Sequence, residues 1–168
     1  MTDNYVELLI KRKTSPMVKA LHFSGILMGV FQLLLMVLSH AWFFVFSGAF
    51  FIGLAYLIAY VGNIEYEYLY LDKQFSIDRI YNRKKRKKAA EYDLETQLEV
   101  LAPTGSCYLQ DVKGKVSCVK DYTSGKADAR TYEMVVHEGK ELWLIKIEMT
   151  DELWEQLYMT APRKVYKN

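Results

Sequence analysis

Six consecutive basic residues, Arg83 to Lys88, are the strongest candidate for chemistry in the sequence. Residues 63–168 hold 18 basic and 18 acidic side chains, so the part outside this run carries a net charge of −6. Clusters of roughly four to eight Lys and Arg beside an inner leaflet attract anionic lipid, at about 1 kcal/mol each. The run therefore predicts lipid contact, with a solvated turn and an acidic protein partner as alternatives. Its members are Arg83, Lys84, Lys85, Arg86, Lys87 and Lys88.

Other reactive side chains form no recognisable catalytic or metal site. Cys107 and Cys118 have no further ligands at zinc-site spacing, and we expect both thiols to be reduced in a cytoplasmic domain. The segment from Ser124 to Lys126 lacks the upstream glycine of a phosphate-binding loop, and no nucleophile elbow or kinase signature occurs. We expect no metal, no cofactor and no enzymatic activity, with a membrane-surface enzyme as the least favoured alternative. A short basic patch in a neutral domain also argues against nucleic acid as a partner.

An uncharged stretch precedes the basic run. No Asp, Glu, Lys or Arg occurs in the 45 residues between Lys19 and Glu65. A bilayer core about 30 Å thick needs about 20 helical residues, so this stretch is long enough for two spans. We expect a transmembrane hairpin over residues 18–62, with spans at about 18–38 and 42–62. The alternatives are a buried helical hairpin of a soluble protein and a cleaved signal peptide.

Basic residues flank the start of this hairpin but not its central turn. Lys11–Lys13 and Lys19 lie at the start, whereas the turn around His40 contains no Lys or Arg. Basic loops stay on the cytoplasmic side of a membrane. We therefore expect a multi-pass protein of the cytoplasmic membrane with both termini in the cytoplasm. Residues 1–17 would form a cytoplasmic N-terminal segment.

Small residues lie at matching depths of the two expected spans. Gly25 and Gly29 of the first span face the depth of Gly53 and Ala55 of the second, and Ala49 lies one turn away. Small residues allow helices to approach closely in lipid. The pattern predicts helix packing through Gly25, Gly29, Ala49 and Gly53, either within one hairpin or between two copies of a homo-oligomer.

Residues 63–168 predict a small β-rich domain with a final helix. Alternating Glu and aromatic residues over 64–71 indicate a strand. Further strands are expected at 75–81, 87–92, 108–112, 116–122, 131–136 and 141–149, and 94–101 is either a helical turn or a strand. At about 150–161, Thr150 can cap a helix whose Leu153, Trp154 and Leu157 form an apolar stripe. The predicted fold class is a membrane α-helical hairpin plus an α+β domain, a curled antiparallel sheet or barrel that the amphipathic C-terminal helix plugs.

This order of parts resembles the bacterial pleckstrin-homology-like (PH-like) domains attached to membrane hairpins. The resemblance lies in Tyr-rich Glu65 to Tyr81, in Ile80 to Lys85 and in Pro162 to Val165. The whole chain is similar to a family of small bacterial two-span membrane proteins. This likeness implies a scaffold or binding role at the bacterial cytoplasmic membrane and supplies no catalytic residue. A protein-interaction or oligomerisation module of a membrane complex is the alternative.

Overall fold

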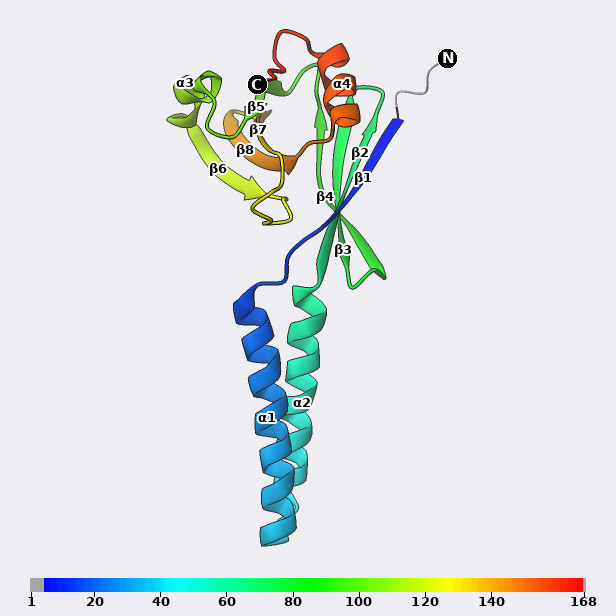
Figure 1. Ribbon diagram of the computed structural model, residues 1–168, viewed down its shortest axis with the longest axis vertical. Helices are drawn as coiled ribbons and strands as arrows, with labels where there is room; N and C mark the ends of the chain where they lie inside the picture. The colour runs from blue at the N-terminus through cyan, green and yellow to red at the C-terminus, as the bar shows by residue number, and fades with distance from the viewer. Residues whose placement is uncertain (1–4, 168) are drawn as a thin grey trace. The chain divides into compact units, whose positions relative to one another are not determined.

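The computed structural model describes residues 5–167 and divides the chain into two compact units (Figure 1). One unit comprises Lys13–Ile64 and Tyr81–Lys85 and contains two long helices. The other unit comprises the rest of the chain and contains both β-sheets and the C-terminal helix. The order of elements is that of the expected fold class.

Two apolar helices make up most of the first unit. Helix α1 spans Pro16–Ser39 (24 residues) and helix α2 spans Phe43–Gly62 (20 residues). At 1.5 Å per residue they are about 36 and 30 Å long, enough to cross a bilayer core. Most of their large hydrophobic side chains are exposed, which favours lipid over water as their surroundings. Both helices are thus long and apolar enough to span a membrane.

Glycines allow α1 and α2 to pack closely. A methyl group in place of the Gly25 hydrogen would lie 2.9 Å from the Cβ of Ala55. At Gly29 the same change would place a methyl group 3.0 Å from the carbonyl oxygen of Gly48. Gly25 and Gly29 therefore lie in a contact between two helices of the same chain, the first of the two predicted arrangements.

Of the small residues expected on α2, Ala55 lies in the contact, whereas Ala49 and Gly53 do not and need correction. Ala49 and Gly53 are exposed, and nothing lies within 4 Å of the position that a Cβ of Gly53 would take. Gly48 and Ala55 are buried in the contact. Matching depths predicts the height of a residue along the helix but not its direction, and successive residues differ by about 100° around the axis.

The first β-sheet has the strand order β1-β2-β3-β4. Strand β1 pairs antiparallel with β2 along its whole length, from Tyr5 opposite Leu71 to Lys11 opposite Glu65. Residues 1–17 therefore include an edge strand of this sheet, which the hydrophobic pattern did not reveal. The strands are β1 Tyr5–Lys11, β2 Ile64–Leu71, β3 Gln74–Tyr81 and β4 Lys85–Asp93.

The second β-sheet has the strand order β5-β7-β8-β6. Strands β7 and β8 form the expected hairpin, and β6 pairs parallel with β8. The strand predicted at residues 108–112 is wrong. These residues belong to the short helices η1 (Cys107–Leu109) and α3 (Gln110–Lys113). The helical spacing of Leu109 and Val112 packs both side chains on this sheet. The strands are β5 Leu98–Pro103, β6 Val116–Asp121, β7 Thr131–Glu138 and β8 Glu141–Glu148.

Tyrosines of β2 supply much of the core between the two sheets. Tyr66, Tyr68 and Tyr70 alternate along the strand and are fully buried. The Tyr68 hydroxyl donates a hydrogen bond to the carbonyl of Tyr122, just beyond β6, at 2.8 Å. A buried hydroxyl with a partner avoids the cost of an unsatisfied polar group, so these tyrosines serve packing.

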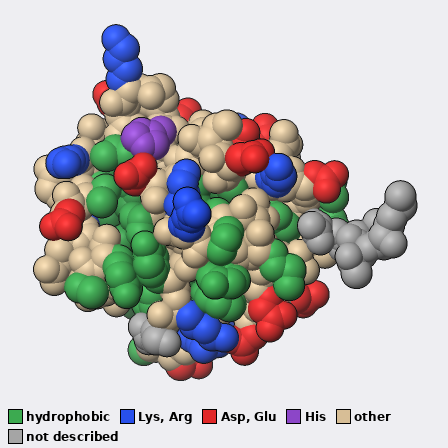
Figure 2. Space-filling view, turned by 90° about the horizontal axis from the view of Figure 1, so that it is seen from above, with side chains coloured by type: hydrophobic (Ala, Val, Ile, Leu, Met, Phe, Trp, Pro, Cys, Tyr) green, Lys and Arg blue, Asp and Glu red, His purple; other side chains and the backbone are tan. Residues whose placement is uncertain are grey.

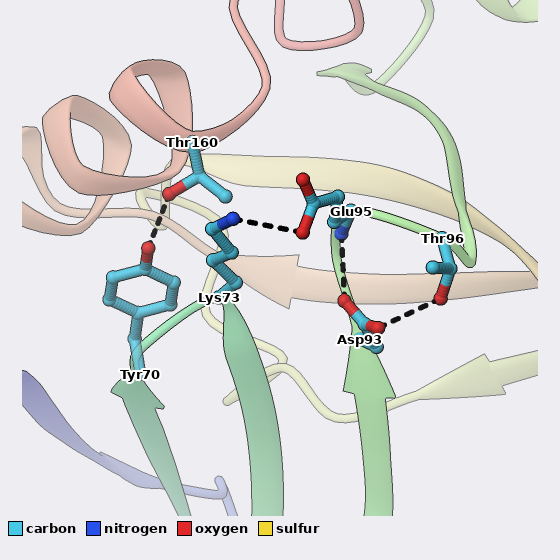
Figure 3. Close-up of polar contacts among 6 residues, drawn as sticks. All are labelled: Tyr70, Lys73, Asp93, Glu95, Thr96 and Thr160. Carbon is cyan, nitrogen blue, oxygen red and sulfur yellow. Dashed lines mark hydrogen bonds and ion pairs between the residues drawn. The ribbon is translucent and has the colours of Figure 1, made fainter.

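Helix α4 (Asp151–Thr160) follows the second sheet and packs at one end of the first. The Thr150 hydroxyl accepts a hydrogen bond from the Leu153 N–H at 3.3 Å, which confirms the predicted cap. At the other end of the helix the Thr160 hydroxyl contacts the hydroxyl of Tyr70 (Figure 3). The C-terminal helix is therefore joined to β2 as well as to the chain that precedes it.

Candidate functional site

The basic run (Arg83–Lys88) occupies a tight turn and the first part of β4. Asn82 and Arg83 have φ angles of 47° and 56°, and the Lys84 N–H donates to the Tyr81 carbonyl at 3.0 Å. Two successive residues with positive φ are typical of a type I′ hairpin turn. The strand then begins at Lys85, two residues earlier than expected, so most of the run lies beyond the turn. All six basic side chains are exposed.

Two asparagines attach this turn to the end of helix α2. Asn63, which follows the last residue of α2, accepts a hydrogen bond at its carbonyl from the Asn82 N–H at 2.9 Å. The Asn63 side-chain amide also donates to the Asn82 side-chain oxygen at 3.2 Å. These bonds lie within the unit that contains α1 and α2. The basic turn (Asn82–Lys85) is therefore held at the end of a helix of membrane length.

Basic residues of this unit gather at one end of the helical hairpin. Val18 would lie within 2.5 Å of a methyl group at Gly62, so α1 begins where α2 ends. Lys13, Lys19 and the basic turn thus share that end. The connection between the helices, by contrast, contains no charged residue.

Two members of the basic run pair with acidic side chains of the sheet. Arg86 lies 2.6 Å from a carboxylate oxygen of Glu67, which is buried, and 3.9 Å from Asp78. Burial raises the pKa of the Glu67 carboxyl above its usual range, and the Arg86 charge acts against that rise. Lys88 lies 2.8 Å from Glu91 at an exposed position. Arg86 therefore neutralises a buried carboxylate, and its charge is not fully available to a ligand.

Lys84, Lys85 and Lys87 are the members of the run best placed to meet a ligand. All three are exposed, and within residues 5–167 no acidic side chain pairs with them. Ammonium groups without a protein partner keep their full charge for an external anion. The predicted contact set therefore contains these three lysines without an acidic partner in the described chain, and Arg86 and Lys88 with acidic partners of their own.

Comparison with known proteins gives a family for nearly the whole chain. A family model described as "Bacterial PH-like domain (DUF6106)" matches residues 2–167. The chain belongs to this bacterial PH-like family. No curated protein and no solved structure matches it. The matched residues include both the helical hairpin and the β-rich domain, so the family comprises both parts.

On the face of the PH-like protein that Figure 2 draws, the charges are mixed. Figure 2 shows acidic and basic side chains interspersed with hydrophobic ones on one face, without a continuous basic patch. A surface of this kind neutralises itself at short range and attracts anions weakly. The basic run therefore differs from that face in carrying cations of one sign along consecutive residues.

A polar cluster beside the β2–β3 turn of the PH-like domain has a structural explanation (Figure 3). Lys73 on the turn lies 2.9 Å from Glu95, and the Asp93 carboxylate accepts hydrogen bonds from the Glu95 N–H and the Thr96 hydroxyl. The Thr96 hydrogen bond lowers the pKa of the Asp93 carboxyl. These side chains satisfy one another, so the cluster closes two loops and offers no unmatched charge.

Within the described part of the chain, no three His, Cys, Asp or Glu side chains lie close enough together to hold a metal ion. Cys107 is exposed, Cys118 is half-buried, and the two do not form a disulfide. The sulfur chemistry of the domain is therefore that of two separate thiols.

Sequence reasoning missed Asn63 and Asn82, the residues that place the basic turn. A signal was present, because asparagine tolerates the positive φ of a hairpin turn better than most residues, and Asn82 begins such a turn. Nothing in the sequence, however, indicates which residue receives the hydrogen bonds of that turn. The pairing of residues 19 positions apart became visible only in the fold.

Proposed function

We propose that this protein is a non-enzymatic binding module, a PH-like domain anchored in the bacterial cytoplasmic membrane that contacts anionic head groups of the inner leaflet. The observation that carries the proposal is the hydrogen bond from the Asn82 N–H to the Asn63 carbonyl. It ties the basic turn to the end of α2, so that when α2 spans a bilayer the turn lies at head-group depth.

The charge distribution supports a cytoplasmic position for this end of the hairpin. Lys13, Lys19 and the basic turn gather there, and the opposite connection between the helices is uncharged. Short loops rich in Lys and Arg stay in the cytoplasm. Both termini are then expected in the cytoplasm, because the chain enters and leaves the hairpin at the same end.

Three lysines account for most of the expected attraction. Lys84, Lys85 and Lys87 are exposed, and no acidic residue of the described chain pairs with them. At about 1 kcal/mol per cation near an anionic surface, they supply up to about 3 kcal/mol before losses. Salt weakens the attraction, because the screening length is only about 10 Å at 0.1 M ionic strength.

Selectivity for spin-labelled lipids in bilayers that contain the full-length protein tests this proposal. We expect the protein-associated fraction of phosphatidylglycerol to exceed that of phosphatidylcholine, and the excess to fall as salt is added. Replacing Lys84, Lys85 and Lys87 by Gln should remove most of the excess, since this variant loses the unpaired cations of the run.

A second triple variant with the same change of net charge is the matched control. It replaces Lys115, Lys126 and Lys140, which are exposed and lie outside the basic run. The control should keep the preference for phosphatidylglycerol. Equal selectivity in the two triple variants would remove the lipid proposal and leave an acidic protein as the partner to seek.

A further inference from the structure

A groove runs along the outer side of α2 up to the basic turn. Its volume is about 560 Å³, and α1 contributes no residue to its lining. The α2 side of the lining includes Gly53, Tyr56, Leu57 and Tyr60, and the groove reaches Asn63 and Asn82. All of these residues belong to the unit that contains the helical hairpin.

The spacing of the lining residues gives the groove a defined length and direction. Positions 53, 56, 57 and 60 recur at helical intervals, so they form one stripe along α2, and Asn63 directly follows the helix. Ten residues at 1.5 Å each extend about 15 Å, which is half of a bilayer core about 30 Å thick. The groove therefore covers the depth of one leaflet.

The chemistry of the groove changes from its lower end, at Gly53, to its upper end, at Asn63 and Asn82. Gly53 and Leu57 are apolar, and Gly53 leaves open space because nothing lies within 4 Å of its Cβ position. Asn63 and Asn82 carry side-chain amides at the upper end, next to the lysines of the basic turn. An apolar channel that ends at amides and cations has the polarity of a lipid with an anionic head group.

We propose that this groove binds a single anionic phospholipid of the leaflet on the side of the basic turn. One acyl chain lies along Gly53 and Leu57, and the phosphate lies against Asn82 with Lys84 and Lys85 as counter-ions. The inference rests on the proposed function and deepens it, from attraction between a surface and several cations to a site for one molecule. A lipid is the occupant because the groove is one leaflet deep and its only charged neighbours on the turn are cations.

Native mass spectrometry of the full-length protein tests the inference, with phosphatidylglycerol and phosphatidylcholine as the added lipids. The wild-type chain should retain one phosphatidylglycerol and bind phosphatidylcholine more weakly. The Cβ position of Gly53 has no atom within 4 Å, so Gly53→Leu should fill the lower groove and weaken phosphatidylglycerol binding about tenfold. Ala49→Leu is the matched control, since Ala49 is exposed one helical turn away and does not line the groove; it should bind as the wild type does.

A second variant separates this inference from the proposed function. Replacing Lys84 and Lys85 by Gln should reduce phosphatidylglycerol binding to the level of phosphatidylcholine. If Gly53→Leu binds lipid as the wild type does while the lysine variant loses its anionic preference, the groove site is overturned and the proposed function stands. If the lysine variant keeps its preference, both are overturned.

A second copy of the chain is the competing occupant of the groove. Its presence would give a dimer mass that Gly53→Leu converts to a monomer, and this result would overturn the lipid site. Absence of any retained phosphatidylglycerol on the wild-type chain would also overturn it. The melting temperatures of Gly53→Leu and Ala49→Leu should agree, which shows that a loss of lipid is not a loss of fold.

Discussion

The guanidinium of Arg86 lies 2.6 Å from a carboxylate oxygen of Glu67, a side chain that is almost completely buried. The Arg86 side chain itself is 55% exposed, so the pair joins the surface to the interior of the sheet. A buried carboxylate without a cation is costly. Arg86 thus stabilises the domain, whereas Lys84, Lys85 and Lys87 are exposed and have no acidic partner among the described residues.

We expect Arg86→Gln to lower the free energy of unfolding by about 1.5–3 kcal/mol, because Glu67 loses a charged hydrogen-bond partner. Lys87→Gln removes the same charge from a neighbouring position that has no acidic partner in the described chain, and should cost at most about 0.5 kcal/mol. Chemical denaturation of the full-length protein in detergent, followed by tryptophan fluorescence, measures both. Equal losses in the two variants would show that the Glu67 contact adds nothing.

The loss caused by Arg86→Gln should shrink as the pH falls. Burial raises the pKa of Glu67 above its usual 4.5, and Arg86 opposes this rise, so removing Arg86 raises the folded-state pKa further. A carboxyl whose pKa is higher in the folded state favours folding below the unfolded-state pKa, and this contribution disappears as pH rises through the folded-state pKa. The variant should therefore differ most from the parent at neutral pH and least below pH 4.5. Denaturation curves over this range would contradict the assignment if the difference stayed constant.

Local patterns in the sequence predict those elements whose physical cause lies within the element itself. The uncharged stretch before Glu65 predicts the two long helices, because a membrane span must be apolar on all sides. Thr150 predicts the start of the last helix, because a hydroxyl can satisfy a free N–H of the first turn. In both cases the physical cause acts within one element.

Contacts between distant elements were not predictable in the same way. Strand β1 pairs with residues about 60 positions further on. Its alternation of polar and apolar residues is short, and loops often contain similar short patterns, so it does not identify a strand. That Gly48 is buried in the helix contact, and Gly53 is not, depends on the rotation of α2, which an apolar sequence does not reveal. The bond from Asn82 to Asn63 depends on where β3 returns the chain. The charges of the candidate site were thus predictable, and the hydrogen bonds that hold it at the end of α2 were not.

We expect Gly29→Leu to destabilise the helical hairpin by about 1–3 kcal/mol, because the new side chain would collide with Ile52 and the Gly48 carbonyl. Gly53→Leu makes the same substitution on the open side of α2 and should leave the hairpin stable. Titration with a denaturing detergent, followed by far-ultraviolet circular dichroism, compares the two. If Gly29→Leu instead separated a dimer without loss of stability, the glycine would serve contact between copies.

The cysteines of the PH-like domain provide a test of the proposed orientation. Cys107 is exposed, so a membrane-impermeant maleimide should label it in permeabilised bacterial cells and leave it unlabelled in intact ones. The physical reason is that ends rich in Lys and Arg stay in the cytoplasm, so the proposed orientation places the chain's exit from α2 on that side. Mass spectrometry of the purified protein measures the label.

A cysteine on the opposite side of the membrane supplies the control for this labelling. Trp42 lies between the two helices and is exposed, so Trp42→Cys, in a chain with Cys107 and Cys118 replaced by Ser, should react in intact cells. Basic residues lie at one end of the hairpin and not at the other, and that asymmetry is the driving force for orientation. Labelling of Cys107 in intact cells, together with protection of the Trp42→Cys thiol, would place the basic turn outside and remove the inner leaflet as its target.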